Sequence, residues 1–237
     1  MRRHNYGICI GMQRTDKIIQ GKQALDHIDL KLDAGQIVGL LGPNGSGKTT
    51  MIKLAAGLLK PTEGEMLIGG LKPGKITKAH VAYLPDKDFL PSYMTTDQLL
   101  NMYQDFYKDF NRSRALEMIS SLSLNRQQKM KEMSKGTREK LQLILTMSRE
   151  AAVYLLDEPI AGVDPAARDY ILRTIISNYS EKALVVISTH LIADVEAVLD
   201  DIVFLKSGQI VLHRQADDLR EETGESVDHV FREVFKC

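Results

Sequence analysis

The chain has 237 residues, of which 43% are hydrophobic and 26% charged, the ordinary composition of a globular protein with a sizeable core. Lysine plus arginine and aspartate plus glutamate both number 31, so the net charge favours neither nucleic acid nor an anionic membrane surface as the main partner. No apolar run approaches the roughly 18 residues of a transmembrane helix, the first residues do not resemble a secretory signal, and Cys9 and Cys237 suggest neither a disulfide framework nor a metal site. We therefore expect a protein of the reducing cytoplasm.

The first predicted elements are strands. Residues 6–12 have the composition of a strand, and so do residues 26–33, in which apolar and charged side chains alternate. Such alternation is typical of an antiparallel sheet with one solvated face. Further along the chain, short strands are predicted at Glu65–Ile68 and at Val81–Pro85, where a proline ends the second.

A glycine-rich segment lies between these strands and matches the pattern G-x-x-x-x-G-K-[ST] from Gly42 to Thr49. It follows Ile37–Leu41, a predicted buried parallel strand, and its glycines allow a tight turn whose backbone N–H groups can hold phosphate oxygens. Lys48 opens the next helix, expected to run to about Leu59 with an interruption near Gly57, and the helix dipole adds to its charge. Thr49 offers a hydroxyl to the Mg²⁺ that accompanies a nucleoside triphosphate. We expect a nucleotide-binding P-loop rather than an accidental match, although the motif alone does not separate ATPases, GTPases and kinases.

Residues 95–149 have apolar side chains at helical spacing, which predicts a helical insert. Thr96 and Asn111 are candidate N-caps within it. The aromatic residues of the insert are expected to pack in its core rather than contact a cofactor, because nothing polar converges on them.

Two adjacent carboxylates, Asp157 and Glu158, end an apolar strand that begins at Ala151. Ligands of open α/β sheets bind at the carboxyl ends of the strands. Asp157 suits a magnesium ligand there, while Glu158 points to the opposite side of the extended chain and can face a water beyond the γ-phosphate. The alternative is an ordinary acidic turn before Pro159, but paired acids after a buried strand are costly unless a cation or a proton transfer uses them.

The last third of the chain continues the same pattern. Asp164 and Pro165 are predicted to start a helix, and Ala183–Ile187 is a further buried strand that leads to His190. Alone, His190 would be read as a structural histidine, but its place at the carboxyl end of a third such strand favours a contact with the γ-phosphate. A hairpin is predicted over 202–212, followed by a charged surface helix from Asp217.

Read in this order, the motifs resemble those of the nucleotide-binding subunit of an ABC transporter over nearly the whole chain. Gly42–Thr49 resembles its Walker A motif, Val153–Glu158 its Walker B motif with the catalytic glutamate, Ala161–Asp164 its D-loop, and Ser188–His190 its switch histidine. The resemblance implies the α/β fold of a P-loop NTPase, with a mixed β core, an antiparallel β subdomain and the helical insert. It also implies a single ABC ATPase domain over residues 1–237.

This resemblance further implies an ATPase that binds ATP and Mg²⁺ at the cytoplasmic face of the cell membrane and drives a separately encoded integral membrane permease. No nucleic acid is expected as a partner. In this family two ATPase domains, identical or paralogous, face each other, and the signature loop of one covers the ATP of the other. The implied catalytic residues are Glu158 and His190, the ATP-binding residues are Gly42, Asn44, Gly45, Ser46, Gly47, Lys48, Thr49, Thr50, Ser134 and Gly136, and the magnesium ligands are Thr49, Asp157 and Asp86.

Three departures from the family pattern stand out. The signature is Met133–Thr137, which keeps a serine and a glycine but has Lys135 where a glycine is usual. Asp86 replaces the glutamine of the Q-loop. Ile18–Ile19 stand where the family has an aromatic that stacks on adenine, so the base would rest on an aliphatic surface or on an aromatic such as Tyr6.

The first two departures are similar to those of bacterial exporter ATPases associated with peptides and antibiotics. Phe89–Met94 falls where the family receives a coupling helix from its membrane partner.

Two other functions remain as alternatives. A soluble ABC ATPase of repair or translation would usually carry two such domains or a nucleic-acid-binding insert, and a regulatory module without hydrolysis conflicts with the retention of Lys48, Asp157, Glu158 and His190 together.

Overall fold

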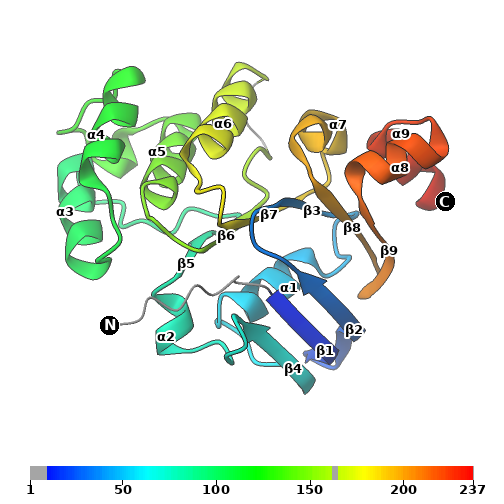
Figure 1. The fold of residues 1–237 in the computed structure, drawn as a ribbon. Helices are drawn as coiled ribbons and strands as arrows, with labels where there is room; N and C mark the ends of the chain where they lie inside the picture. The colour runs from blue at the N-terminus through cyan, green and yellow to red at the C-terminus, as the bar shows by residue number, and fades with distance from the viewer. Residues whose placement is uncertain (1–9, 162–164, 237) are drawn as a thin grey trace.

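The computed structural model describes residues 10–161 and 165–236, and its centre is a six-stranded sheet (Figure 1). The strand order is β5-β6-β7-β3-β8-β9, with β9 antiparallel to β8 and the other neighbouring strands parallel. Every residue of β3, β6 and β7 is buried, as the continuous apolar runs predict. The strands are β3 Ile37–Leu41, β5 Val81–Leu84, β6 Val153–Asp157, β7 Leu184–Thr189, β8 Asp201–Lys206 and β9 Gln209–Gln215.

A second, antiparallel sheet has the order β2-β1-β4, with β1 Ile10–Ile19, β2 Lys22–Leu32 and β4 Glu63–Ile68. The alternation predicted for 26–33 is confirmed, because Ile28 and Leu30 are buried while Asp29 between them is exposed. The first strand was predicted at 6–12, of which 6–9 lie outside the described residues. It continues instead to Ile19 and pairs with β2 across a tight turn at 20–21, where both residues have positive φ.

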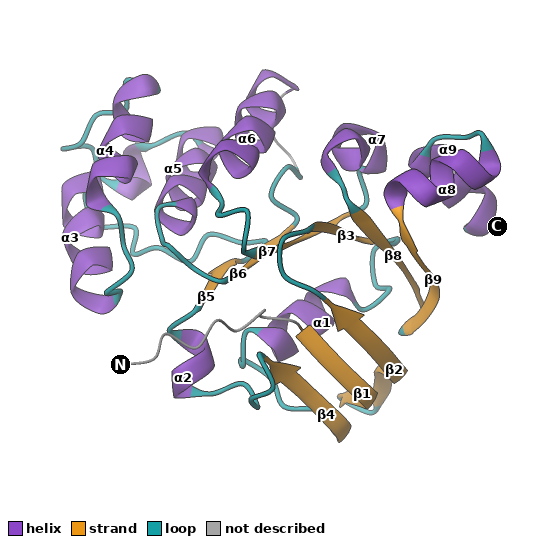
Figure 2. Ribbon diagram, in the orientation of Figure 1, coloured by secondary structure: helices purple, strands orange, loops and turns teal. Residues whose placement is uncertain are grey.

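Helix α1, Lys48–Ala55, follows the P-loop and packs between the two sheets (Figure 2). The sequence predicted this helix to run to about Leu59 with an interruption near Gly57. The helix ends at Ala55, because Gly57 adopts a left-handed conformation at φ +68° and the amides of Leu58 and Leu59 both donate to the carbonyl of Lys53.

The helical insert contains α3 Thr96–Phe106, α4 Arg112–Ser121, a 3₁₀ turn at Met130–Glu132 and α5 Lys135–Met147. Asn111 caps α4 as predicted, accepting a bond from the Arg114 amide at 3.0 Å. The predicted cap Thr96 is wrong by one residue. Thr95 is the cap, because its hydroxyl accepts the backbone N–H of Gln98. The side-chain oxygen of Gln98 in turn accepts the backbone N–H of Thr95.

The remaining helices are α2 Lys75–Lys78, α6 Pro165–Asn178, α7 Ile192–Val195 with a 3₁₀ turn at Glu196–Val198, α8 Ala216–Thr223 and α9 Val227–Val234. In Figure 2, α5 to α9 lie on the side of the central sheet opposite α1 and the small sheet. The C-terminal segment is more than the predicted surface helix, because Phe231 of α9 packs edge-on against Phe204 of β8 at 5.3 Å between ring centroids. The predicted cap at Asp164 lies outside the described residues. None of the helices in the described ranges is long and apolar enough to cross a membrane.

Candidate nucleotide-binding site

The P-loop, the paired acids and His190 come from the ends of three adjacent strands of the central sheet, β3, β6 and β7. Leu41, the last residue of β3, pairs with Thr189 of β7, and Ser188 pairs with Asp157 of β6. The P-loop follows β3 directly, so it meets the two carboxylates and His190 at one edge. This convergence is the one that the carboxyl ends of parallel strands predict.

The P-loop glycines are required by close packing and by backbone conformation. A Cβ atom on Gly42 would lie 2.4 Å from the carbonyl oxygen of Leu205, and one on Gly47, at φ +113°, would lie 2.6 Å from that of Ala24. Gly45 has φ +82° and open space around it. Of the other predicted phosphate-binding residues, Asn44 is exposed, Ser46 is buried and Thr50 is partly buried in the first turn of α1.

Lys48 is only 6% exposed, and its ammonium lies inside the loop. The Nζ atom donates to the carbonyl oxygen of Gly42 at 2.7 Å and lies 3.3 Å from Oε1 of Glu158. The ammonium is therefore held at the mouth of the loop by groups that a phosphate oxygen could replace.

Asp157 is fully buried and has one oxygen without a partner. Its Oδ1 accepts bonds from the hydroxyls of Ser188 at 2.6 Å and Thr49 at 3.1 Å, whereas Oδ2 has no hydrogen-bond partner. Burial raises the pKa of Asp157, and the nearby carboxylates of Asp86 and Glu158 raise it further. A buried, orphaned carboxylate oxygen beside a threonine hydroxyl is a donor set that fits a hard divalent cation.

Glu158 is held from three sides. Its amide donates to the carbonyl oxygen of Ser188 at 3.0 Å, and its backbone has φ +50°, an uncommon value for a residue other than glycine. The carboxylate oxygens lie 3.0 and 3.1 Å from Nδ1 of His190, with Lys48 on one of them. Such a backbone is strained, and strain of this kind is concentrated at functional sites.

Asp86 follows β5 and is exposed. It lines a cavity of about 300 Å³ together with Lys135, Arg138 and Glu158, so the Q-loop, the start of α5 and the Walker B end border one space. Its effect on the pKa of Asp157 places its charge near the buried carboxylate.

Ser134 and Gly136 are not brought to the P-loop of their own chain. Ser134 is the exposed N-cap of α5, where its hydroxyl accepts the amide of Thr137 at 3.2 Å. A Cβ on Gly136 would meet nothing within 4 Å. Gly162 to Asp164 of the predicted D-loop and Tyr6 of the predicted adenine contact lie outside the described residues, whereas Ile18 and Ile19 end β1 with 45% and 38% of their surface exposed.

Ser188 is the residue that the motif analysis did not single out as part of the site. Its hydroxyl bonds Asp157 and its main chain holds Glu158, so it orients both carboxylates. The sequence did place Ser188 near the end of a buried strand. Only the register between β6 and β7, however, shows that Ser188 lies opposite Asp157.

The P-loop, the paired acids and the histidine, gathered at the carboxyl edge of a parallel sheet, define a P-loop nucleoside triphosphatase. Residues 25–161 match the family model described as ABC transporter. The chain is 30% identical over 216 residues to the ABC transporter ATP-binding protein YtrB of Bacillus subtilis (strain 168), which covers 90% of this chain and 74% of that protein. The chain therefore belongs to the ABC transporter family and is an ATP-binding subunit with ATPase activity.

Two further comparisons agree. The chain is 28% identical to the SkfA peptide export ATP-binding protein SkfE of Bacillus subtilis (strain 168), over 84% of this chain and 86% of that protein. A solved structure of the ATP binding subunit of an ABC transporter superposes with a TM-score of 0.86 at 25% identity, over 96% of this chain and 99% of the other. The predicted fold class is thereby confirmed.

Proposed function

We propose that this chain works as a dimer at the cytoplasmic face of the cell membrane, hydrolyses ATP with Mg²⁺, and drives a separately encoded permease that exports peptide or antibiotic-like substrates. The observation that supports ATP hydrolysis is that the adjacent carboxylates of Asp157 and Glu158 have different surroundings. One carboxylate is fully buried with an oxygen left for a cation, and the other is partly buried, with 14% of its side-chain surface exposed, and lies beside the nitrogen atoms of Lys48 and His190. The exporter assignment is supported by the similarity to SkfE and by the variant Q-loop and signature.

The roles follow from the contacts. The P-loop amides and Lys48 bind the phosphates. Thr49 and Asp157 would hold Mg²⁺, with Asp86 as a further acid near it, and the metal would supply charge neutralisation at the phosphates. When Lys48 turns to a phosphate oxygen, Glu158 loses its ammonium neighbour and accepts a proton from the attacking water, while His190 keeps the carboxylate oriented.

A second ATPase domain, identical or paralogous, completes the site in this proposal. Glycine is a poorer helix former than alanine, and a Cβ on Gly136, in the first turn of α5, would meet nothing within 4 Å. The glycine is explained if a group from outside approaches the helix start. Ser134 and the N-terminus of α5 would then bind the phosphates of ATP held by the partner domain.

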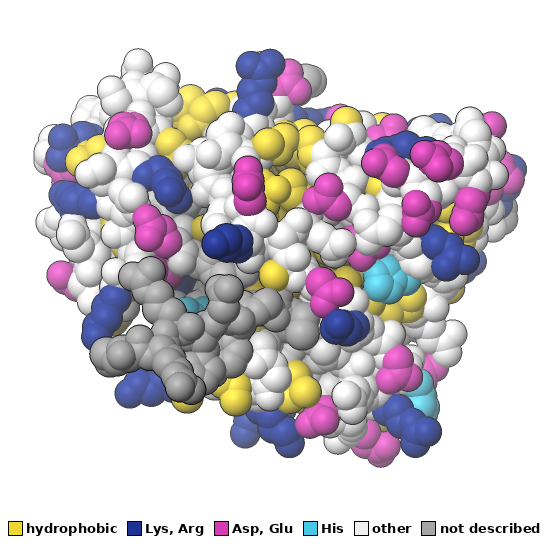
Figure 3. All heavy atoms as spheres, viewed as in Figure 1, with side chains coloured by type: hydrophobic (Ala, Val, Ile, Leu, Met, Phe, Trp, Pro, Cys, Tyr) yellow, Lys and Arg dark blue, Asp and Glu magenta, His cyan; other side chains and the backbone are white. Residues whose placement is uncertain are grey.

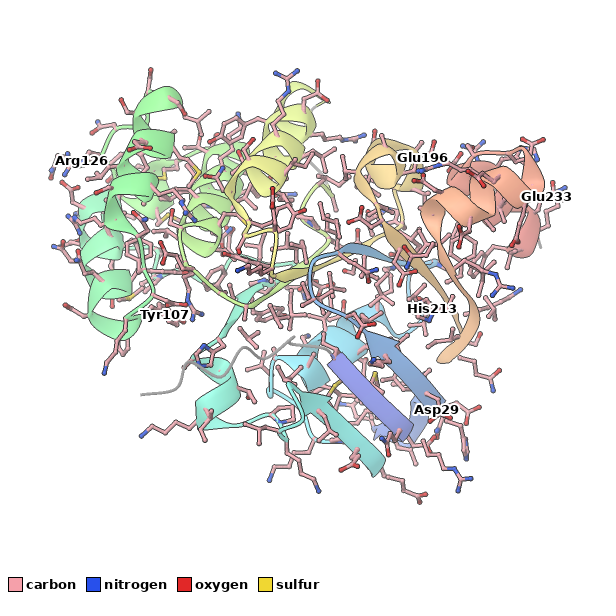
Figure 4. The ribbon with its side chains drawn as sticks, in the orientation of Figure 1. Asp29, Tyr107, Arg126, Glu196, His213 and Glu233 are labelled. Atoms are coloured by element: carbon pink, nitrogen blue, oxygen red, sulfur yellow. The ribbon has the colours of Figure 1, made fainter. Side chains whose placement is uncertain are left out.

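The docking loop, Phe89–Met94, is the part of the chain expected to meet the permease. Its side chains divide in two: Leu90 is buried in the core of the helical insert, whereas Phe89 and Tyr93 are 41% and 67% exposed. Phe89 borders a groove of about 300 Å³, largely apolar and without an acidic side chain among the residues that line it. Its lining includes Leu58, Lys78, Tyr83, Tyr107 and Arg149. Tyr107, in the segment between α3 and α4, is labelled in Figure 4. An apolar helix end fits such a groove.

The test is a resistance assay. The chain is expressed with a neighbouring gene product that has about six hydrophobic spans, and the cells are challenged with a panel of peptide antibiotics. We expect protection that disappears when Lys48→Ala replaces the wild type, because without the lysine the P-loop loses its main charge contact with the phosphates. Protection that persists in Lys48→Ala, or increased sensitivity with the wild type, would contradict export driven by this chain.

A further inference from the structure

The loop that bears Phe89 is fastened to helix α5 by one carboxylate. Asp88 accepts a bond from Nε of Arg138 at 2.7 Å on Oδ2 and from Nε2 of Gln142 at 3.0 Å on Oδ1. Arg138 and Gln142 are four residues apart, so they stand on one face of α5. Both oxygens of Asp88 are thus committed to the same helix.

Gln142 closes the contact from the other side. Its amide is 4% exposed, and its Oε1 accepts the backbone N–H of Phe89 at 3.1 Å. The side-chain amide of Gln142 therefore donates to the Asp88 carboxylate and accepts from the Phe89 backbone, so it holds two successive residues of the loop. Buried polar groups of this kind are costly to separate, because each partner would be left unsatisfied.

Arg138 extends the connection to the start of the helix. Its Nη1 donates to the carbonyl oxygen of Met133 at 2.8 Å, and Met133 is the residue before the N-cap Ser134. The guanidinium consequently bridges the loop at Asp88 and the chain just before the first turn of α5. The planar guanidinium makes charge-assisted bonds in a fixed geometry, so it holds its two partners in place more firmly than the flexible ammonium of a lysine would.

We propose that Asp88, Arg138 and Gln142 form a link that makes the docking loop and the first turns of α5 move as one unit. A membrane partner that displaces Phe89 then shifts Ser134, and a ligand that fixes the start of α5 also fixes the docking loop. The identity of the partner rests on the proposed function, whereas the link is a property of this chain alone.

Hydrogen exchange of the intact chain, followed by mass spectrometry, tests the link without nucleotide. We expect Asp88→Ala to speed exchange about fivefold to tenfold both at 86–90 and at 134–138, since Arg138 and Gln142 each lose their bond to the Asp88 carboxylate and nothing then joins Arg138 to the loop. Gln142→Ala should do so at 86–90. The matched control is Asp97→Ala, which removes another 2.7 Å pair of the insert, to Nε of Arg126 (Figure 4), and should leave both segments unchanged. Faster exchange confined to 86–90 in Asp88→Ala would overturn the link.

The same experiment with ATP and Mg²⁺ separates the link from the proposed function. In the wild type we expect protection at 42–49, at 134–138 and at 89–94, and in Asp88→Ala we expect the protection at 89–94 alone to disappear. Unchanged protection at 89–94 in the variant would contradict the link. Absence of protection at 42–49 in the wild type would instead contradict nucleotide binding, and the measurement without nucleotide would still decide the link. If Asp88→Ala does not fold, Arg138→Lys keeps the charge but cannot bridge Asp88 and Met133, and the same two outcomes apply.

Discussion

Asp157 and Glu158 are adjacent in sequence but meet opposite electrostatic conditions. Burial raises the pKa of Asp157, and an unpartnered buried oxygen costs about 1–3 kcal/mol. Glu158 instead has Lys48 at 3.3 Å and His190 at 3.0 Å. The prediction that Glu158 continues the extended strand is wrong, because β6 ends at Asp157 and Glu158 has a left-handed backbone with φ +50°. The turn at Glu158 gives the two adjacent carboxylates different surroundings, one suited to a cation and the other to accepting a proton.

Asp86 is the residue whose role departs most from the family pattern. An aspartate is shorter than glutamine and charged, so we expect it to act on the metal by charge through a water. Asp86→Ala should raise the Mg²⁺ concentration for half-maximal ATP turnover, while Asp86→Gln should retain substantial activity. The control is Asp218→Ala, an exposed acid on α8. Superimposable magnesium curves for all four proteins would make Asp86 an ordinary turn acid, leaving the metal to Thr49 and Asp157.

At the scale of elements, β8 and β9 are joined by a contact between the buried Asp201 and the exposed His213. Asp201 is 3% exposed and its Oδ2 lies 2.8 Å from Nε2 of His213, across the hairpin (Figure 4). The bond to Asp201 raises the pKa of His213 above its ordinary value near 6.5. A raised histidine pKa means that the stabilisation is complete below pH 6.5 and is lost as the pH rises through the higher, folded-state value.

We therefore expect His213→Gln to lower the melting temperature more at pH 6 than at pH 8.5, because the wild type has lost its charged pair at the higher pH. Thermal melts at both pH values check this. The exposed His229 of α9 provides the control, as His229→Gln. An equal loss at both pH values would show that only the neutral hydrogen bond matters.

The docking loop allows a prediction about a single surface segment. Phe89→Glu and Tyr93→Glu should abolish co-purification with the membrane partner, since a carboxylate in an apolar contact is costly to desolvate. Melting temperature and ATP turnover of the isolated chain should stay near the wild-type values, because both side chains point away from the insert core. Phe106→Glu, at a residue 77% exposed at the end of α3, is the control. Loss of folding in the loop variants would show that the loop only packs on its own insert.

The sequence was sufficient to predict the strands and helices that carry the motifs, because glycines and acids at the ends of apolar runs mark strand ends. It was insufficient where a contact depends on register or on side-chain reach. The opposition of Ser188 and Asp157 needs the β6–β7 register, and the contact of Lys48 with Glu158 crosses two strands. Helix α2 has four residues, too few for a periodic signal. The cap at Thr95 rather than Thr96 follows from its pairing with Gln98, which propensity alone does not resolve.

At the scale of the whole molecule, a buried arginine fastens the helical insert to the central sheet. Arg149 follows α5, is 3% exposed, and donates to the carbonyl of Val81 on β5 at 2.6 Å and to Asp109 of the insert at 2.8 Å. Its guanidinium also stacks over Tyr107 at 4.0 Å.

Figure 3 shows acidic and basic side chains interspersed over the visible face, in keeping with the equal numbers of the two signs. The proposed dimerisation through ATP would therefore rely on local contacts at the site rather than on attraction between oppositely charged faces.

The central claim, that ATP is held between two copies or paralogues and hydrolysed with Glu158 as the base, is tested most directly by size-exclusion chromatography of Glu158→Gln with ATP and Mg²⁺. The amide can still position water but cannot accept its proton, so turnover should fall about a hundredfold or more. If identical chains pair, the variant should then elute as a dimer with ATP and as a monomer without it. Glu158→Gln combined with Lys48→Ala should remain monomeric in both conditions. A single Glu158→Gln variant that stays monomeric with ATP and hydrolyses it at the wild-type rate would contradict the account.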